Sequence, residues 1–316
     1  MKKIAGTVVT AVIVAALMIA AIVMSDSPIT SHQQDTLKIL LIICGCSVAY
    51  CFIVGELAQN FSQMDKLWSI LPIVYTWVIA AQGGMKPRLI LYALIVTAWG
   101  VRLTVNFARK GAYRLKFWTG EEDYRWSIVR QSPLLKPRVA WMLFDLFFIS
   151  LYQNALVLAI TLPALAGMES TASIGVWDIL GAAAAVAFLM LELVADEYQW
   201  RFHQTKKKLL SEGKTLAELP MPYRLGFNIT GPWARMRHPN YLGEQGIWMS
   251  LYFLAVGAGV TNSGFHWSAV GPLLLILLFM GSSTLGESIS SKKYPRYRDY
   301  IDQVCKYLPV HRFNPD

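Results

Sequence analysis

The apolar residues of this chain fall in long runs that are separated by polar segments. A helix rising about 1.5 Å per residue needs a run of about 20 apolar residues to cross the hydrocarbon core of a membrane. Because unpaired backbone groups cannot face lipid, and the alternating pattern of a membrane barrel is absent, these runs must be helices. Eight runs are present, at approximately 4–24, 36–58, 68–82, 88–107, 139–163, 173–194, 245–262 and 267–286. The sequence therefore predicts an all-α fold, a polytopic membrane helix bundle of about eight transmembrane helices.

Composition and charge place this bundle in a membrane with a defined orientation. Of the 316 residues, 55% are hydrophobic and only 16% are charged, which is more apolar than a soluble domain. Eight Lys and Arg residues lie in 109–138, eight in 195–237 and six after residue 287, whereas the alternate loops hold only Lys86 and Arg88. The positive-inside rule then places both termini and both large loops in the cytoplasm. We expect a multi-pass protein of a bacterial inner membrane, whose partner is the lipid bilayer; the net charge of +9 reflects topology and requires no nucleic acid.

The organisation is that of one membrane-embedded domain. The first run is long for the core of a signal peptide, so residues 1–35 are interpreted as an N-terminal transmembrane anchor and outer loop. Residues 36–316 form the membrane-embedded domain. No Cys-x-x-Cys pair occurs and the histidines are isolated, so we expect no metal. No glycine-rich dinucleotide turn follows a strand, so any nucleotide must be held by the helices and their loops.

The most distinctive polar segment, residues 235–244, opens the seventh run. Pro239 suits the first turn of a helix, where unpaired amides attract anions. With two arginines before it, the segment predicts a phosphate-binding site. Asn240 and Glu244 are four residues apart and share one helix face. The simpler alternative is an interfacial anchor with snorkelling arginines and an interfacial tyrosine.

A second set of polar residues lies at the end of the sixth run. Glu192, Asp196 and Gln199 follow one another at the spacing of a single helix face. Polar side chains on one face of a membrane helix line a cavity more often than they face lipid. The sequence therefore predicts a cavity beside this stripe.

A third polar group lies near the end of the fourth run. The charge of Arg102 would cost free energy at this place in the membrane unless an acidic residue or a phosphate paired with it. Asp65 and Asp145 are candidate partners, although Asp145 equally fits a structural hydrogen bond between helices.

Six short segments, in this order, resemble the steroid 5α-reductase superfamily, and most closely its DUF1295 branch. The resemblance covers roughly residues 55–310. It rests on Asp65-Lys66-Leu67-Trp68-Ser69, Trp99-Gly100-Val101-Arg102-Leu103, Glu122-Asp123-Tyr124-Arg125-Trp126, Ala195-Asp196-Glu197-Tyr198-Gln199, His238-Pro239-Asn240-Tyr241-Leu242-Gly243-Glu244 and Tyr294-Pro295-Arg296-Tyr297.

This resemblance implies a seven-helix reductase core, to which the first helix is an addition. It further implies NADPH bound in the cytoplasmic half and reduction of the carbon–carbon double bond of an enone in a small lipid-like or steroid-like substrate. Asn240 and Glu244 match residues that contact the nicotinamide end, and Asp196 and Arg102 match residues that face the cofactor. The expected cofactor-binding residues are Arg102, Asp123, Arg125, Asp196, Gln199, Arg235, Arg237, His238, Asn240, Tyr241, Glu244, Glu287, Tyr294 and Tyr297.

The sequence departs from the steroid reductases at the residues that polarise the substrate. A Glu and a Tyr of those enzymes appear here as Asp65 and Trp99. An indole donates a hydrogen bond but cannot act as an acid at neutral pH. The candidate catalytic proton donors are therefore Asp65, Tyr75 and Tyr92.

Two other functions remain open on sequence grounds. The isoprenylcysteine carboxyl methyltransferases, which bind S-adenosylmethionine, share Arg-His-Pro-x-Tyr and a later Glu followed by tyrosines, here Glu287 with Tyr294 or Tyr297. Methyl transfer has no need for Asn240 or for the Leu-Gly-Glu that follows Tyr241, which favours the reductase. A non-enzymatic lipid-binding or scaffold protein is the third alternative, for which Trp99 is the best argument. Nothing in the sequence indicates an oligomeric state.

Overall fold

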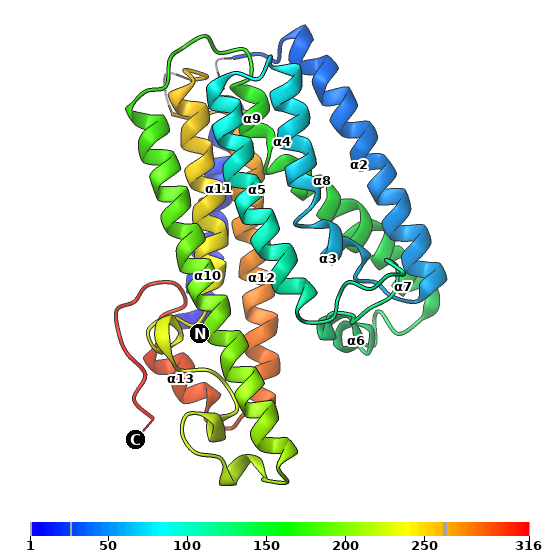
Figure 1. Ribbon diagram of the computed structural model, residues 1–316, viewed down its shortest axis with the longest axis vertical. Coiled ribbons are helices and arrows are strands. Elements are labelled where there is room, and N and C mark those ends of the chain that lie inside the picture. Colours follow the sequence, from blue (N-terminus) through cyan, green and yellow to red (C-terminus); the bar gives the residue numbers. More distant parts are fainter. Residues whose placement is uncertain (1, 26, 262–263, 316) are drawn as a thin grey trace. The chain divides into compact units, whose positions relative to one another are not determined.

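The computed structural model describes residues 2–25, 27–261 and 264–315, and every regular element within these ranges is a helix (Figure 1). The α-helices are α1 (Lys2–Val23), α2 (Ser31–Ala58), α3 (Gln63–Leu67), α4 (Leu71–Gln82), α5 (Pro87–Ala108), α6 (Tyr124–Arg130), α7 (Arg138–Phe144), α8 (Gln153–Ala159), α9 (Leu162–Ala166), α10 (Val176–Ser211), α11 (Pro239–Gly257), α12 (Val270–Lys293) and α13 (Tyr297–Gln303). A π-helix, η1 (Asp145–Tyr152), and four 3-10 helices complete the set: η2 (Leu216–Glu218), η3 (Tyr223–Leu225), η4 (Gly231–Ala234) and η5 (Trp267–Ala269). The prediction of an all-α fold is confirmed for this part of the chain.

Several of these helices are suited to a membrane. Within the described ranges, five are long and apolar enough to cross one: Ser31–Ala58, Pro87–Ala108, Arg138–Ala159, Val176–Ser211 and Trp267–Lys293. Two shorter apolar stretches accompany them: Thr10–Val23, which is part of α1, and Leu71–Gln82, which is α4. The prediction of a multi-pass membrane protein is thus confirmed, whereas the count of about eight spans stays a prediction.

The bounds of the predicted runs differ from those of the helices that form; the helix of the sixth run, 173–194, for example, continues to Ser211. The third run, 68–82, begins in the turn between α3 and α4, and α4 itself has 12 residues. The seventh run, 245–262, extends beyond the end of α11 at Gly257, and its last residue lies outside the described ranges. Apolar sequence therefore continues past a helix terminus at both places, so the ends of an apolar run do not mark the ends of the helix.

The chain divides into two compact units. The unit called here the N-terminal unit comprises Val12–Ala183 and Met249–Leu275. The unit called here the C-terminal unit comprises Met1–Ala11, Ala184–Trp248 and Ile276–Asp316. Helices α10, α11 and α12 each contribute residues to both units. The predicted division at residue 35 separates an N-terminal anchor from the membrane-embedded domain, not one compact unit from another, and it stays a prediction.

The N-terminal unit is built around α2, α4 and α5. Helix α4 packs along α5, to which it is joined by a short turn, and α2 packs against η1, α8 and α4 (Figure 1). Helices α7 and α8 are continuous through η1, so that one helix runs from Arg138 to Ala159 with a π-helical middle. Single π-helical turns inside α-helices occur frequently at functional sites.

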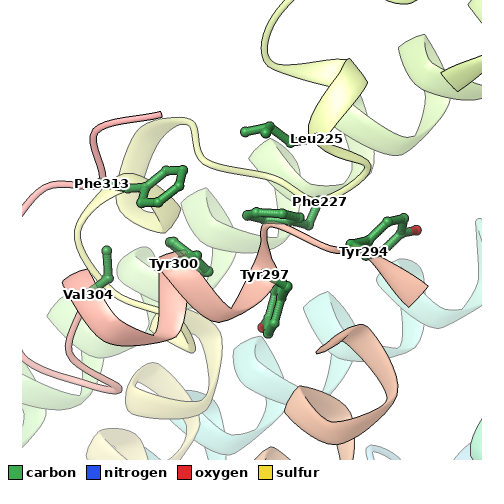
Figure 2. Packing of buried hydrophobic residues seen from close by; sticks show 7 residues of the cluster. All are labelled: Leu225, Phe227, Tyr294, Tyr297, Tyr300, Val304 and Phe313. Atoms are coloured by element: carbon green, nitrogen blue, oxygen red, sulfur yellow. The ribbon is translucent and has the colours of Figure 1, made fainter. Parts of the chain in front are cut away.

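An aromatic cluster in the C-terminal unit holds together residues from a loop, a helix and the C-terminal tail (Figure 2). The ring of Phe227 lies 4.9 Å from that of Tyr297 and 5.3 Å from that of Tyr300, and Phe313 lies 5.3 Å from Tyr300. Offset and edge-to-face aromatic pairs of this kind stabilise beyond their buried area. Gly226 has a φ of 84°, and a Cβ there would collide with the ring of Tyr294, so only glycine fits beside this cluster.

Arg88 and Asp178 form an enclosed ion pair in the N-terminal unit. Arg88 Nε donates to Asp178 Oδ1 at 2.6 Å and Nη2 donates to Oδ2 at 2.9 Å, while the two side chains are 7% and 0% exposed. The remaining guanidinium hydrogen atoms are donated to Ser170 Oγ and to the carbonyls of Ala172, Ser173 and Gly257. One side chain thereby joins α5 to the beginning of α10, to the last residue of α11 and to the loop between α9 and α10.

We expect Asp178→Ala to destabilise the protein by about 3–5 kcal/mol, because it leaves the Arg88 charge enclosed without a partner. The measurement is thermal unfolding of the purified protein in detergent. Asp35→Ala is the matched control, since Asp35 pairs with Lys38 at a position where both side chains are 70% exposed, and it should have little effect. Equal melting temperatures for the two variants would contradict the role given to the Arg88–Asp178 pair.

Candidate functional site

Helices α10 and α11 approach each other closely in the C-terminal unit because two glycines of α11 face α10. A Cβ on Gly243 would lie 2.7 Å from the Cβ of Glu192 and 2.9 Å from the carbonyl oxygen of Phe188. A Cβ on Gly246 would collide with the Phe188 ring. Small residues at such contacts allow the backbones of membrane helices to pack together. Gly243, the glycine of the segment 235–244, therefore positions the polar side chains that lie before and after it on α11.

This close packing brings Asp196 of α10 and Asn240 of α11 together. Asn240 Nδ2 donates to Asp196 Oδ1 at 3.3 Å. The Oδ1 atom of Asn240 is shielded from solvent and has no hydrogen-bond partner among the described residues, and the same holds for Oε1 of Gln199. Shielded polar atoms are nearly always paired in native proteins. Two unpaired acceptors near the Asp196–Asn240 contact are therefore suited to a ligand that brings N–H or O–H donors.

Glu244 lies one turn beyond Asn240 on α11. Its side chain is 4% exposed, and its Oε1 accepts a hydrogen bond from Trp248 Nε1 at 3.3 Å. The ring of Tyr241 stacks on that of His238 at 5.1 Å and lies 4.5 Å from that of Phe279. The start of α11 thus presents the half-buried amide of Asn240 and the buried carboxylate of Glu244 beside a group of aromatic rings.

Glu287 of α12 accepts hydrogen bonds from both Arg237 and His238. Its Oε1 atom lies 2.8 Å from Arg237 Nε and 2.8 Å from His238 Nε2. Arg237 Nη1 also donates to the carbonyls of Ile301 and Val304, and the amides of Arg237 and His238 donate to the carbonyls of Cys305 and Lys306 at 3.1 Å. The segment before α11 is therefore tied to α12 and to the chain that follows α13.

Burial lowers the pKa of His238 below its usual value and outweighs the opposite effect of Glu287. The imidazole is therefore neutral at pH 7. Since an ionised carboxylate only accepts hydrogen bonds, the Nε2 atom of neutral His238 carries the hydrogen that it donates to Glu287.

Three further predicted residues lie elsewhere in the C-terminal unit. Arg235 is exposed. The rings of Tyr294 and Tyr297 belong to the aromatic cluster of Figure 2, and the Tyr294 hydroxyl lies 3.4 Å from Lys206 Nζ. Their predicted roles in cofactor binding stay predictions.

In the N-terminal unit, the loop after α5 is fastened to α3 by an enclosed lysine. Lys66 is fully buried, and its Nζ donates to the carbonyls of Phe117 at 2.8 Å and Thr119 at 2.9 Å. The hydroxyl of Tyr113 donates a hydrogen bond to the backbone carbonyl of Lys66 at 2.7 Å. The sequence did not single out this role of Lys66, because its partners are backbone carbonyls, which carry no signal in side-chain patterns.

The same loop brings Asp123 and Arg125 towards Asp65. Trp126 Nε1 donates to Asp65 Oδ2 at 2.9 Å, and Arg125 binds both oxygens of Asp123, at 2.8 and 2.9 Å. The amide of Asp123 donates to Ser62 Oγ at 2.9 Å. In the sequence Trp126 stands out only as part of a motif, whereas in the structure it is the direct partner of a candidate catalytic residue.

The two carboxyl groups of this network differ in pKa. Burial, followed by the charge of Asp123, raises the pKa of Asp65 above its usual value. Burial acts on Asp123 in the same direction, but the hydrogen bonds and charge of Arg125 outweigh it and leave the pKa of Asp123 below its usual value. Of the two, Asp65 is therefore the group that keeps its proton to the higher pH.

The interior of the N-terminal unit contains several enclosed polar atoms without partners. The hydroxyls of Tyr75 and Tyr92 make no hydrogen bond of normal geometry to any described residue, although both side chains are at most 2% exposed. Oδ2 of Asp145 and Oδ1 of Asn154 likewise have no hydrogen-bond partner among the described residues. These atoms come from four packed elements, α4, α5, η1 and α8, and are suited to the polar groups of a mainly apolar ligand.

Arg102 is half-buried on α5, in the N-terminal unit together with Asp123 and Arg125. Asp196 and Asn240 belong to the C-terminal unit. The prediction that Arg102 acts in one site with Asp196 and Asn240 therefore stays a prediction.

These features define a multi-pass, all-α membrane protein with shielded, unpaired polar groups at helix ends and inside its helices. The family described as "Protein of unknown function (DUF1295)" matches residues 51–304. An uncharacterized protein of Schizosaccharomyces pombe, C594.04c, is 35% identical over 269 residues, which are 81% of this chain and 74% of the relative. The chain therefore belongs to the DUF1295 family. No solved structure matches it.

We expect Glu287→Gln to loosen the segment before α11 and to cost about 2–3 kcal/mol, because Arg237 loses its charged partner. Hydrogen–deuterium exchange should then be faster at the amides of Arg237 and His238, whose hydrogen bonds to residues 305 and 306 depend on this tie.

Glu212→Gln serves as the control, since it removes the same charge from an exposed pair in the same unit. Its exchange pattern should match that of the unmodified protein. Unchanged protection of Arg237 and His238 in Glu287→Gln would show that Glu287 does not hold this segment.

Proposed function

We propose that this protein is a membrane-bound reductase that uses NADPH to reduce the carbon–carbon double bond of an enone in a lipid-like or steroid-like substrate. The observation that carries the proposal is the contact of Asn240 with Asp196, in which Asn240 Oδ1 is shielded and accepts from no donor of the described ranges. A nicotinamide carboxamide has the N–H donors that this oxygen lacks. The resemblance to steroid reductases rests on the same residues.

The C-terminal unit would hold the cofactor. Asn240 and Gln199 offer shielded acceptors, and Glu244 offers a carboxylate one turn further along α11. The stacked rings of His238 and Tyr241 would help to keep water from the bound cofactor at this end of the helix. When bound, NADPH would supply a hydride to the β-carbon of the enone, and such chemistry requires a water-poor site.

The N-terminal unit would hold the substrate and supply the proton. The enclosed hydroxyls of Tyr75 and Tyr92 are suited to donate hydrogen bonds to an enone oxygen, which becomes more basic as the double bond is reduced. Asp65 is suited to deliver a proton to the α-carbon, since its raised pKa keeps it protonated up to a higher pH than an ordinary carboxyl group.

A methyltransferase that uses S-adenosylmethionine is the second candidate. One observation favours it: Arg237, His238 and Glu287, which all belong to the motif shared with the isoprenylcysteine carboxyl methyltransferases, contact one another. Because their hydrogen bonds hold the segment before α11 in place, the contact serves either enzyme. The unpaired Asn240 Oδ1 favours the reductase.

The proposal includes an orientation. The basic loops and both termini would face the cytoplasm, where NADPH is available, in keeping with the positive-inside rule. We further propose a bacterial inner membrane as its location; the relative from fission yeast extends the family to a eukaryote.

The experiment is a thermal-stability titration of the purified protein with NADPH and, separately, with S-adenosylmethionine, since a ligand that binds only the folded state raises the melting temperature. We expect NADPH to stabilise the protein, and Glu244→Gln to bind NADPH roughly tenfold more weakly, because it removes a charged hydrogen-bond acceptor. Glu197→Gln, on the exposed face of α10, should bind NADPH normally. Stabilisation by S-adenosylmethionine alone would replace the reductase with the methyltransferase, and no response to either would favour a non-enzymatic lipid-binding or scaffold protein.

A second prediction concerns pH. A general acid must hold its proton, so the rate of enone reduction should be highest below the raised pKa of Asp65 and should fall as pH rises through it. Asp123→Asn removes the charge that raises this pKa, so the fall should move to lower pH. The measurement is the initial rate of NADPH oxidation with an enone substrate across the pH range. If Asp65→Asn kept both the rate and its fall with pH, Asp65 would not be the proton donor.

A further inference from the structure

The N-terminal unit contains a cavity of about 540 Å³ that neither proposed ligand uses. It lies between α6, the beginning of α7 and the segment after α2, and is lined by Phe61, Trp126, Arg130, Gln131, Lys136 and Trp141, among others. Its volume is within the range of about 300–1,000 Å³ that is typical of small-molecule sites. We call it the α6–α7 pocket.

The α6–α7 pocket lies where two membrane-spanning helices end. Phe61 follows the last residue of α2 by three positions, and Trp141 is in the first turn of α7. Apolar side chains are exposed beside the pocket: Leu134, in the connection between α6 and α7, is 82% exposed, and Val139, in the first turn of α7, is 63% exposed. Exposed apolar residues beside basic ones are typical of segments that lie at the boundary between lipid head groups and acyl chains.

Arg130 supplies the pocket with a positive charge that no acid neutralises by direct contact. Its guanidinium lies over the rings of Phe61 and Trp141, 5.4 and 5.3 Å from their centroids. Cation–π contacts of this kind do not occupy the N–H donors of the guanidinium. Among the described residues, no hydrogen bond or ion pair engages these donors.

The remaining charges of the pocket also favour an anion. Lys136 lines it and is exposed. The one acid on the pocket wall is Glu122, whose Oε1 atom accepts a hydrogen bond from the amide of Phe61 at 2.6 Å. Two cations and a single, already engaged carboxylate give the wall a positive balance.

We propose that the α6–α7 pocket binds the phosphate group of an anionic phospholipid. Arg130 is suited to bind a phosphate through its N–H donors while the two aromatic rings beside it hold its guanidinium at the pocket. Lys136 adds a second charge, and the exposed apolar side chains beside the pocket contact the acyl chains. The described residues that line the pocket are not those assigned to NADPH or to the enone, so this proposal does not depend on the reductase. Trp126 of the pocket wall also donates to Asp65, so the pocket adjoins the proposed proton donor.

The test measures lipid binding to the full-length protein in detergent, by native mass spectrometry and by thermal stability. The probes are phosphatidylglycerol, which is anionic, and phosphatidylcholine, which is zwitterionic. We expect phosphatidylglycerol to bind more tightly and to raise the melting temperature. Arg130→Gln should weaken its binding roughly five- to tenfold, and Lys136→Gln by a smaller factor.

Arg114→Gln is the matched control, because it removes the same charge from an exposed position between α5 and α6, outside the pocket, and it should bind phosphatidylglycerol normally. Lys136 is exposed, so Lys136→Gln remains informative even if Arg130→Gln fails to fold. Equal binding of the two lipids by the unmodified protein would overturn the proposal, as would equal losses in Lys136→Gln and Arg114→Gln.

Soluble competitors distinguish the source of the phosphate. Glycerol phosphate should displace phosphatidylglycerol only weakly, since it lacks acyl chains. Binding of glycerol phosphate as tight as that of the lipid would assign the pocket to a soluble phosphate ester instead. Displacement of the lipid by NADPH would assign the pocket to the nucleotide and would also overturn the proposal.

Discussion

A polar side chain that is enclosed by membrane helices must find its hydrogen-bond partners inside the protein, because neither lipid nor water supplies them there. Arg88 meets this constraint fully, with a carboxylate, a hydroxyl and three carbonyls around its guanidinium. Lys66 meets it with carbonyls of the loop that follows α5. Where every partner is present, the charge fastens helices and loops together.

The same constraint gives meaning to the atoms that lack partners. The hydroxyls of Tyr75 and Tyr92, and Oδ1 of Asn240, are shielded yet unpaired among the described residues. Leaving such groups unpaired costs free energy, so a protein that keeps several of them gains by binding a ligand that pairs them. The contrast between Arg88 and Asn240 therefore separates the structural polar groups from those that we assign to function.

Much of this could be predicted from the sequence, because helical periodicity and apolar run length are local properties. The all-α membrane fold follows from the runs, and the stripe through Asp196 and the segment that contains Asn240 pointed to the two side chains that prove to be in contact. The π-helical turn at Asp145 could not be predicted, since it changes one hydrogen-bond register without changing the apolar pattern. Arg88 attracted attention only as a charge in an outer loop, because its partner Asp178 is 90 residues away and a single acid in an apolar run does not identify its partner.

We propose for this protein a membrane enzyme that combines a nucleotide with an apolar substrate, and the central claim of that proposal is that the C-terminal unit binds NADPH in a water-poor site. The most direct measurement is the fluorescence of NADPH during titration with the purified protein. We predict a saturable, blue-shifted increase in nicotinamide emission that excess NADP⁺ reverses and that Asn240→Ala abolishes. Emission that stays identical to that of free NADPH at every protein concentration would contradict this claim.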